Sequence, residues 1–506
     1  MKKLTAWVLL AVLLLGTTSC GNSNVNTPEN TTSTDTQISS DTVDSVVTEV
    51  EEKEITASSM ITDKFGGQNY DGREFRILGF DVGGHFANNI SNTFMEVWAE
   101  EYNGEIINDA IYDRNAQASE LLNITIVPQL VTTTSEMATR IKQAVSAAAD
   151  DFDVALQSLS NLGTTLQNNE LANFKKFPTL DTSSPWYDQN SVETFTLFGE
   201  KLYWLTGDYM LLDDYAVHVI FFNKNLVTNA GQELPYDTVR EGDWTLDKFC
   251  AMTKAAELDV NGDGKMVIGT DIVAHLENHD KIKHWVYGCR ERSITINEDK
   301  TLEIDTLSER QVNVVERLYH YTVEEGMTYS ISDDTQLSPA FKSGLATSYC
   351  IALAFINQYR DMPDDFGIVP MPKYDETQEE YGHYISNYAA TALCCPLTVS
   401  DREFVGTCIE TLSAFSTETV NTALYDVLLT SKLVRDQESV EMLEIALSTK
   451  YYDWAVDFPW GSSFEAAYNG VYDKKTFNYV SAATSALKAQ KKLLERLIDN
   501  ISEFED

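Results

Sequence analysis

The 506-residue chain is poor in basic residues and contains only seven histidines and seven cysteines. Lys and Arg together number 37 against 78 Asp and Glu, which gives a formal charge of -41. This excess of negative charge argues against nucleic acid or anionic lipid head groups as ligands. Because the acidic residues are scattered along the chain, they are typical of a hydrated surface and do not indicate a cationic substrate.

The cysteines lack the spacing of a disulfide framework or of a zinc site, since no C-x-x-C pair occurs. Most of the six that follow Cys20 have apolar neighbours, which predicts small, buried, hydrophobic side chains, although a disulfide stays open. The six are Cys250, Cys289, Cys350, Cys394, Cys395 and Cys408.

Catalytic motifs are also missing, because there is neither a G-x-S-x-G elbow nor a glycine loop of the phosphate-binding kind. His275 and His279 could share a helix face, but the segment HLENH places its Glu wrongly for a zinc protease. A glycosidase would need two carboxylates facing each other across a cleft. Asp213 and Asp214 are a poor pair, since neighbours on an extended strand point to opposite faces.

The one long apolar run is at the start of the chain. Met1, Lys2 and Lys3 precede an apolar stretch over 6–15, and small and polar residues then lead to Cys20. This run is shorter than the roughly 20 residues of a membrane-spanning helix, so a signal peptide over 1–19 is expected. The segment resembles a bacterial lipobox, and the resemblance implies lipidation of Cys20 and a position anchored on the extracytoplasmic face of the cell membrane.

After Cys20 the chain is rich in Asn, Thr, Ser, Asp and Glu and nearly free of aromatic residues. Such a composition cannot bury enough apolar surface to offset its ordering entropy, so 20–60 is predicted to be a disordered linker. The remaining body is larger than a single hydrophobic core usually supports, which predicts two lobes.

Strands and helices alternate in the first part of this body. Apolar periodicity predicts strands at 74–80, 124–127 and 152–157, and helices over 105–122 and 137–149. Alternation of this kind indicates an α/β protein with mostly parallel sheets covered by helices, and with ligands beyond the carboxyl ends of the strands.

The later part of the chain is mostly helical by the same criterion. Helical spacing covers 404–415, 439–448 and 482–501, and the last of these is a long amphipathic helix. We expect these helices to complete the second lobe.

Five segments in register resemble a known family. They are 199–208 (GEKLYWLTGD), 219–224 (VIFFNK), 242–249 (GDWTLDKF), 341–346 (FKSGLA) and 365–372 (DFGIVPMP). Together with the strand that ends near Gln157 and the loop after it, they are similar to blocks of the extracellular solute-binding proteins of bacterial ABC importers. The nearest group is the maltose-binding-like carbohydrate binders, known as family 1.

The resemblance implies a type II periplasmic-binding-protein fold, in which two lobes rotate about a hinge and enclose a ligand. It implies an N-terminal lobe of 61–217 and 342–400, and a C-terminal lobe of 218–341 and 401–506. It further implies a carbohydrate ligand, delivery to an ABC transporter permease, no bond-breaking chemistry and no required cofactor. We expect a monomer, with no nucleic acid bound.

Carbohydrate ligands suit aromatic rings combined with carboxylates and amides. Several tryptophans are expected in loops, namely Trp186, Trp204, Trp285, Trp454 and Trp460. The sequence predicts four ligand contacts, namely Tyr209, Asp213, Asn387 and Trp460. For each of them, the alternative is a structural position in the core.

The segment 259–265 (DVNGDGK) reproduces the first half of a calcium loop of the EF-hand type. Asp259, Asn261, Asp263 and Lys265 form the candidate structural calcium site. The twelfth position is Thr270, which cannot supply a bidentate carboxylate. A turn whose side chains cap their own backbone is therefore the alternative.

Two other functions stay open. A secreted glycan-active hydrolase would release sugar from oligosaccharides, whereas a binding protein would show only a ligand-dependent rise in melting temperature. A surface adhesin would show no response to small molecules.

Overall fold

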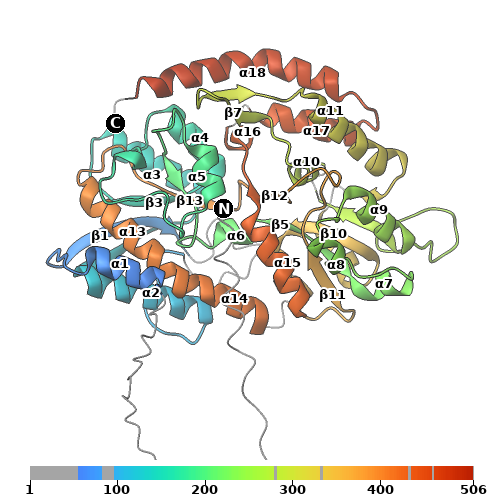
Figure 1. The fold of residues 1–506 in the computed structure, drawn as a ribbon, viewed down its shortest axis with the longest axis horizontal. Coiled ribbons are helices and arrows are strands. Elements are labelled where there is room, and N and C mark those ends of the chain that lie inside the picture. Colours follow the sequence, from blue (N-terminus) through green and yellow to red (C-terminus); the bar gives the residue numbers. More distant parts are fainter. Residues whose placement is uncertain are drawn as a thin grey trace, which may run out of the picture. The chain divides into compact units, whose positions relative to one another are not determined.

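Figure 1 shows the computed structural model of the chain, which describes residues 55–81, 96–278, 282–330, 334–430, 435–458 and 461–504. The chain divides into two units, Met1–Glu54 and Ile55–Asp506, and every described residue belongs to the second. The predictions for Cys20, His279 and Trp460 lie outside the described residues. None of the described helices combines the length and the apolar character that crossing a membrane requires.

The first sheet has the strand order β2-β1-β3-β13-β4. Strand β1 is parallel to β2 and β3, whereas β13 is antiparallel to β3 and β4. The strands are β1 (Arg73–Phe80), β2 (Ile124–Val131), β3 (Val154–Ser158), β4 (Trp204–Leu205) and β13 (Thr391–Cys394). The predicted strands at 74–80, 124–127 and 152–157 are thus confirmed.

The second sheet has the order β11-β5-β10-β6-β9. Strands β10, β6 and β9 run parallel, and β5 is antiparallel to both β10 and β11. The strands are β5 (His218–Asn223), β6 (Val273–Glu277), β9 (Thr328–Tyr329), β10 (Ala346–Ala352) and β11 (Phe366–Val369). Every residue of β5, β6, β10 and β11 is buried, which fits sheets covered on both faces.

Helices cover both sheets (Figure 1). Those nearest the first sheet are α1 (Ala57–Phe65), α2 (Ile106–Leu122), α3 (Thr134–Ser146), α4 (Leu159–Gln167), α5 (Gln189–Phe195), α6 (Leu212–Tyr215), α13 (Arg402–Glu418) and α14 (Val420–Thr430). Those nearest the second are α7 (Lys224–Asn229), α8 (Tyr236–Arg240), α9 (Leu246–Ala255), α10 (Lys283–Gly288), α11 (Glu309–Tyr319), α12 (Leu337–Lys342) and α15 (Gln437–Ser448).

The remaining elements connect or flank these layers. Two small sheets pair β7 (Ile294–Ile296) with β8 (Leu302–Ile304), and β12 (His383–Tyr384) with β14 (Lys450–Tyr451). The other helices are α16 (Trp454–Asp457), α17 (Ser462–Asp473) and α18 (Tyr479–Ser502). The short turns are η1 (Phe174–Lys176), η2 (His320–Glu324), η3 (Asp334–Gln336) and η4 (Leu353–Tyr359).

The predicted C-terminal helices are confirmed as α13, α15 and α18. Helix α18 buries one stripe of side chains, packs on α17, β8 and α11, and also contacts α4 beside the first sheet. In Figure 1 it lies along the top of the molecule (red).

Strand pairing differs from the expected lobe division at two places. Strands β10 and β11 belong to the second sheet, so the chain returns to the first sheet after Val369 and not at 342. Helix α13 packs on α1 and α2, next to the first sheet, although the C-terminal lobe was expected from 401. An amphipathic pattern shows that a helix has a buried face, but it does not show which sheet covers that face.

The predicted linker also ends earlier than expected. Helix α1 begins at Ala57, where Thr56 and Ser59 form a capping box and Ile61 and Phe65 are buried. The folded body therefore includes residues that were predicted to be disordered.

The two sheets are joined by crossing segments that hydrogen-bond to one another. The backbone N–H of Leu353 donates to the carbonyl of Val217 at 2.8 Å, and that of Ser386 donates to the carbonyl of Ala216 at 3.0 Å. Val217 also forms an antiparallel bridge with Ile385. This bundle of crossings is the structural counterpart of a hinge.

Candidate functional site

One strand of each sheet, β3 in the first and β6 in the second, ends in a polar residue. Ligands of α/β folds bind beyond the carboxyl ends of such strands. Strand β3 ends at Ser158, whose Oγ lies 2.8 Å from Ser160 Oγ and 3.1 Å from the carbonyl oxygen of Asn387. Strand β6 of the second sheet ends at Glu277, which is buried.

An aromatic cluster lies between these two strand ends. The ring of Tyr384 stacks on that of Tyr287 with centroids 5.3 Å apart, and it contacts the ring of His218 at 5.1 Å. Lys283 Nζ lies 4.6 Å from the centroid of the Tyr384 ring, and Tyr384 Oη donates to Asn387 Oδ1 at 3.3 Å. Residues of the crossing segments and of α10 thus meet in one place.

This cluster lines a pocket of about 10 Å³, here named the central pocket. Its walls are Leu159, Tyr287, Tyr384, Ile385, Asn387, Tyr451, Tyr452, Asp453, Val456 and Asp457. Such a volume holds about one water molecule, so a larger solute can enter only when the walls move apart.

Asp457 differs from the other polar residues of the central pocket. Both of its carboxyl oxygens are buried and neither has a hydrogen-bond partner among the described residues. Burial, reinforced by the nearby Asp453 and Glu465, holds the pKa of Asp457 well above its usual range. A protonated carboxyl offers one donor and one acceptor, which is the pairing that a sugar hydroxyl satisfies.

A glycine fixes the position of Asp457. The Asp457 carbonyl oxygen lies 2.1 Å from the point where Gly163 would carry a Cβ, so any larger residue there would push α16 away from α4. Asp453, one turn earlier, is in contrast held by the backbone N–H groups of Ser293, Ile294 and Ala455.

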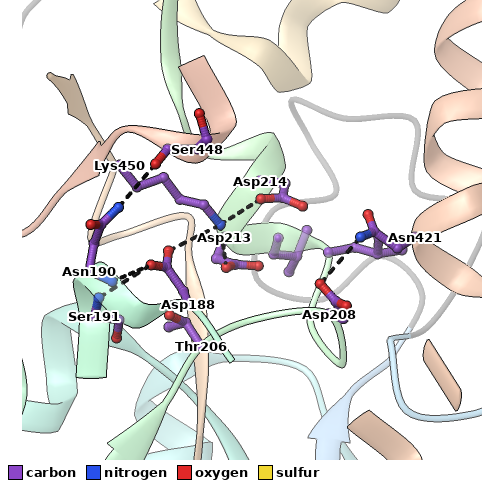
Figure 2. Close-up of polar contacts among 12 residues, drawn as sticks. Asp188, Asn190, Ser191, Thr206, Asp208, Asp213, Asp214, Asn421, Ser448 and Lys450 are labelled. Atoms are coloured by element: carbon purple, nitrogen blue, oxygen red, sulfur yellow. Dashed lines mark hydrogen bonds and ion pairs between the residues drawn. The ribbon is translucent and has the colours of Figure 1, made fainter. Parts of the chain in front are cut away.

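A second and larger cavity, of about 450 Å³, lies beside β14 and is here named the Lys450 cavity. Lys450 Nζ lies 2.8 Å from Asp213 Oδ2, 2.6 Å from Asp214 Oδ1 and 3.5 Å from Asp188 Oδ2 (Figure 2). Burial opposes the charged ammonium, but the carboxylates of Asp213 and Asp214 raise the pKa of Lys450 well above its usual value. Lys450 is therefore a fixed cation.

Asp208 borders the same cavity and accepts a hydrogen bond from Thr417. It accepts another from Asn421 (Figure 2). Burial is the main reason that the pKa of Asp208 rises to about 7, and the negative charge of Asp214 adds to it.

A third pocket of about 370 Å³ shares Asn190 and Lys450 with the Lys450 cavity. Arg290, Arg292 and Tyr451 line it, and the Arg292 guanidinium lies 3.9 Å from the centroid of the Tyr451 ring.

The predicted ligand residues lie in three different places. Asn387 lines the central pocket, and Asp213 is paired with Lys450. Tyr209 is buried with the guanidinium of Arg114 4.5 Å from its ring centroid. The fourth, Trp460, lies outside the described residues, so the set stays a prediction as ligand contacts.

Of the tryptophans expected in loops, Trp186 lies in a turn, Trp204, Trp285 and Trp454 lie in β4, α10 and α16, and all four are buried. Trp204 and Trp454 pack edge to face at 5.3 Å, Trp285 lies in α10, and Trp186 is 3% exposed. Each indole is large enough that burying it stabilises the core more than exposing it in a loop would.

At two places the backbone conformation differs from the one considered from the sequence. Asp213 and Asp214 lie in the short helix α6 and not on an extended strand, so both carboxylates reach the same ammonium group. His275 lies in strand β6 and not on a helix, because a continuous apolar run surrounds it.

At the predicted calcium loop the side-chain oxygens accept backbone N–H groups of the loop itself. Asp259 accepts from Gly262 and Gly264, Asn261 accepts from Asp263, and Asp263 accepts from Lys265. These bonds are those of the self-capped turn, and calcium binding stays a prediction.

Four residues of these sites were not predicted from the sequence, namely Tyr287, Tyr384, Lys450 and Asp457. Tyr384 lies three residues before Asn387, so the segment around Asn387 contained a usable signal. Lys450 showed none, since its partners Asp213 and Asp214 are 237 and 236 residues away.

Comparison with known proteins finds no matching family model and no matching curated protein. Solved structures do match over most of the chain. One is a cyclo/maltodextrin-binding protein in complex with maltotetraose, with a TM-score of 0.54, 14% identity, and coverage of 86% of this chain and 99% of that chain. This is the fold of the extracellular solute-binding proteins.

Two other solved structures with the solute-binding fold carry different ligands. The galacto-N-biose/lacto-N-biose I-binding protein of the ABC transporter from Bifidobacterium longum, in complex with lacto-N-biose, has a TM-score of 0.55 at 11% identity and covers 84% of this chain and 98% of its own. UgpB from Mycobacterium tuberculosis, in complex with glycerophosphocholine, has a TM-score of 0.54 at 15% identity, with 84% and 99% covered. The expected two-lobed fold is confirmed. Sequence identities this low do not indicate which ligand this chain binds, so the ligand class is argued from the side chains of the site.

Proposed function

We propose that this chain is an extracytoplasmic, lipid-anchored solute-binding protein that captures a carbohydrate between two lobes and delivers it to an ABC transporter permease. The observation that carries the proposal is the central pocket, in which stacked tyrosines, an amide and an unpaired carboxyl lie between the two sheets beside the crossing segments. The anchor is supported by the sequence around Cys20.

The central pocket has the chemistry of a sugar site. Aromatic rings such as Tyr384 offer flat faces for C–H groups, at about 1 kcal/mol for each stacking contact. Asn387 and the protonated Asp457 offer acceptors and donors for hydroxyls, and a hydrogen bond between neutral groups contributes about 0.5 to 1.5 kcal/mol. Capture followed by release suits a dissociation constant near micromolar, or about -8 kcal/mol.

Domain closure supplies the mechanism. A ligand shifts the equilibrium between open and closed forms only if it binds the closed form more tightly. Tyr384 ends β12 just before the crossing residues Ile385 and Ser386, and Asn387 follows them. Tyr287 belongs to α10 beside the second sheet. A sugar that touches all of them makes its full set of contacts only when the lobes meet.

Hydrolysis is the weaker alternative, for a reason of geometry. Asp453 and Asp457 are the carboxylates of the central pocket, but three backbone N–H groups and Tyr287 Oη saturate Asp453. A carboxylate held in this way is poorly placed to act as a nucleophile or a base.

A thermal-shift screen of the body from Ile55 onward against mono- and oligosaccharides tests the proposal, with chromatography of each sugar after incubation. We expect a rise in melting temperature with at least one sugar and no change in the sugar itself. Sugar release would establish the hydrolase. A response to no carbohydrate, with a response to a glycerophosphodiester or a peptide, would overturn the proposed ligand class.

The anchor is tested separately in cells. Cys20→Ala is expected to release the chain from the membrane fraction while the purified body binds the same sugar. Membrane association that persists in Cys20→Ala would refute lipidation at this position.

A further inference from the structure

Three potential metal ligands meet in the second sheet, away from the Lys450 cavity. Glu277 at the end of β6, His284 in α10 and Cys350 in β10 each place one ligand atom within 4.8 Å of the other two. All three side chains are at most 1% exposed. The parallel register of β6 and β10 sets Cys350 beside Glu277, which explains the proximity despite their separation in sequence.

Neighbouring groups hold the Glu277 carboxylate in one orientation. Its Oε2 accepts a hydrogen bond from Trp285 Nε1 at 2.6 Å and lies 3.3 Å from His275 Nε2. His275 is oriented in turn by Ser348 Oγ, 2.8 Å from its Nδ1. The other oxygen, Oε1, faces His284 Nε2 at 2.8 Å. Outer partners of this kind fix the ligands of metal sites in proteins.

The ligand types select the metal. Imidazole, carboxylate and thiolate are the three ligands that Zn²⁺ takes from proteins, in a tetrahedral arrangement. Ca²⁺ and Mg²⁺ prefer oxygen ligands only. The thioether sulfur of Met371 lies 3.5 Å from Cys350 Sγ and adds a second soft sulfur donor beside the cluster.

We propose that Glu277, His284 and Cys350 bind a Zn²⁺ ion, with the proton of the Cys350 thiol released to solvent on binding. The proposed zinc site uses none of the residues that line the central pocket, but it lies close to that pocket, because the His218 ring contacts both His284 and Tyr384. His284 stacks on His218 at 5.4 Å with an angle of 21°, and His218 begins β5 directly after the first crossing. The ion would therefore tie α10 to β6 and β10 next to the hinge.

The test uses the full chain, stripped of metal with a chelator and then titrated with Co²⁺ as a spectroscopic substitute for Zn²⁺. We expect one equivalent to produce tetrahedral d–d bands and a thiolate-to-cobalt charge-transfer band, both removed by added Zn²⁺. Cys350→Ser is expected to abolish the charge-transfer band. The matched control is Cys289→Ser, since Cys289 is equally buried in the same half of the chain and lies outside the cluster.

Zinc affinity supplies an independent readout. Ser348→Ala removes a group that orients His275 and is expected to weaken zinc binding roughly 10- to 100-fold. Glu277→Gln removes a ligand and is expected to weaken it further.

The wild-type spectrum decides the question even if a variant fails to fold. A wild-type chain that gives no charge-transfer band, or whose melting temperature is the same after chelation and after zinc addition, overturns the site. A band that persists in Cys350→Ser also overturns it. In either case the cluster is a buried polar network around Glu277 and not a metal site.

Discussion

The Lys450 cavity and the central pocket both contain buried carboxylates, but they satisfy them differently. Around Lys450 one ammonium group lies within 3.5 Å of the carboxylates of Asp188, Asp213 and Asp214, all more than 200 residues earlier in the chain. In the central pocket Asp457 has no partner among the described residues. A buried ion pair is costly to break, whereas an unpaired buried carboxyl is costly to keep.

This difference indicates a structural role for the Lys450 cluster and a ligand-binding role for Asp457. The Lys450 cluster connects β14 to α6 and to the residue before α5, which fixes segments far apart in sequence. The central pocket keeps a polar group whose burial is destabilising unless something else pairs with it. An unpaired group of this kind is a better candidate for ligand contact than a saturated one.

The largest expected effect comes from breaking the Lys450 cluster. Lys450→Met leaves Asp213 and Asp214 buried without a cation, and removal of one partner of a buried pair costs about 3 to 5 kcal/mol. Denaturant unfolding should show this loss. The matched control is Lys248→Met, because its pair with Asp243 at 3.4 Å is exposed and should contribute less than about 1 kcal/mol. Equal losses of stability in both variants would show that the ion pairs of Lys450 do not stabilise the fold more than an exposed pair does.

Substitution of Asp457, unlike that of Lys450, should not lower the stability of the fold. Asp457→Leu removes a buried unpaired carboxyl, so stability should stay equal or rise, while affinity for the carbohydrate should fall about 10- to 100-fold. Asp453→Leu is the control, since it deletes a carboxylate that three backbone N–H groups need and should destabilise the fold. Calorimetry combined with unfolding separates the two quantities. Unchanged affinity in Asp457→Leu would remove Asp457 from the site.

Part of this organisation could be predicted from the sequence. Strands β1 and β3 and helices α2, α15 and α18 follow apolar periodicity, which is a local property of the chain. The fold followed from the order of such elements. The assignment of β10 and β11 to the second sheet could not be predicted, because strand partners are chosen by long-range packing.

The candidate site was less predictable than the fold. Asn387 lines the central pocket, but its predicted role as a ligand contact stays a prediction. The tryptophans drew attention as sugar-binding residues, yet the described ones are core residues. Tyrosines line the central pocket instead, since a phenol can keep its ring packed and its hydroxyl bonded.

Asp208 should make stability depend on pH by a smaller amount. Its folded-state pKa of about 7 lies above the ordinary value, so the stability that its proton contributes is complete below about pH 4 and is lost as the pH rises through about 7. Because Asp208 borders the Lys450 cavity, where solvent screens its charge, the contribution to stability is expected to be only roughly 1 to 2 kcal/mol. In Asp208→Asn the fall in stability between about pH 4 and pH 7 should shrink by this amount in denaturant titrations. An unchanged pH profile would show that the carboxyl titrates normally.

The smallest effect is expected at the residue that follows Asn387 of the central pocket. Tyr388 is 57% exposed next to Asn387, so Tyr388→Ala should lower carbohydrate affinity by about 1 kcal/mol with no loss of stability. Tyr102→Ala is a matched control, because Tyr102 is equally exposed but is not a sequence neighbour of any residue that lines the central pocket. If calorimetry gives both variants the same affinity, the ligand does not reach Tyr388.

Closure of two lobes on an unchanged carbohydrate is tested most directly by small-angle X-ray scattering of the body from Ile55 onward. With a sugar that binds by calorimetry, the radius of gyration should decrease, and the same sugar should leave Asp457→Leu unchanged at a concentration that saturates the wild type. Superimposable wild-type profiles with and without the bound sugar would contradict the account.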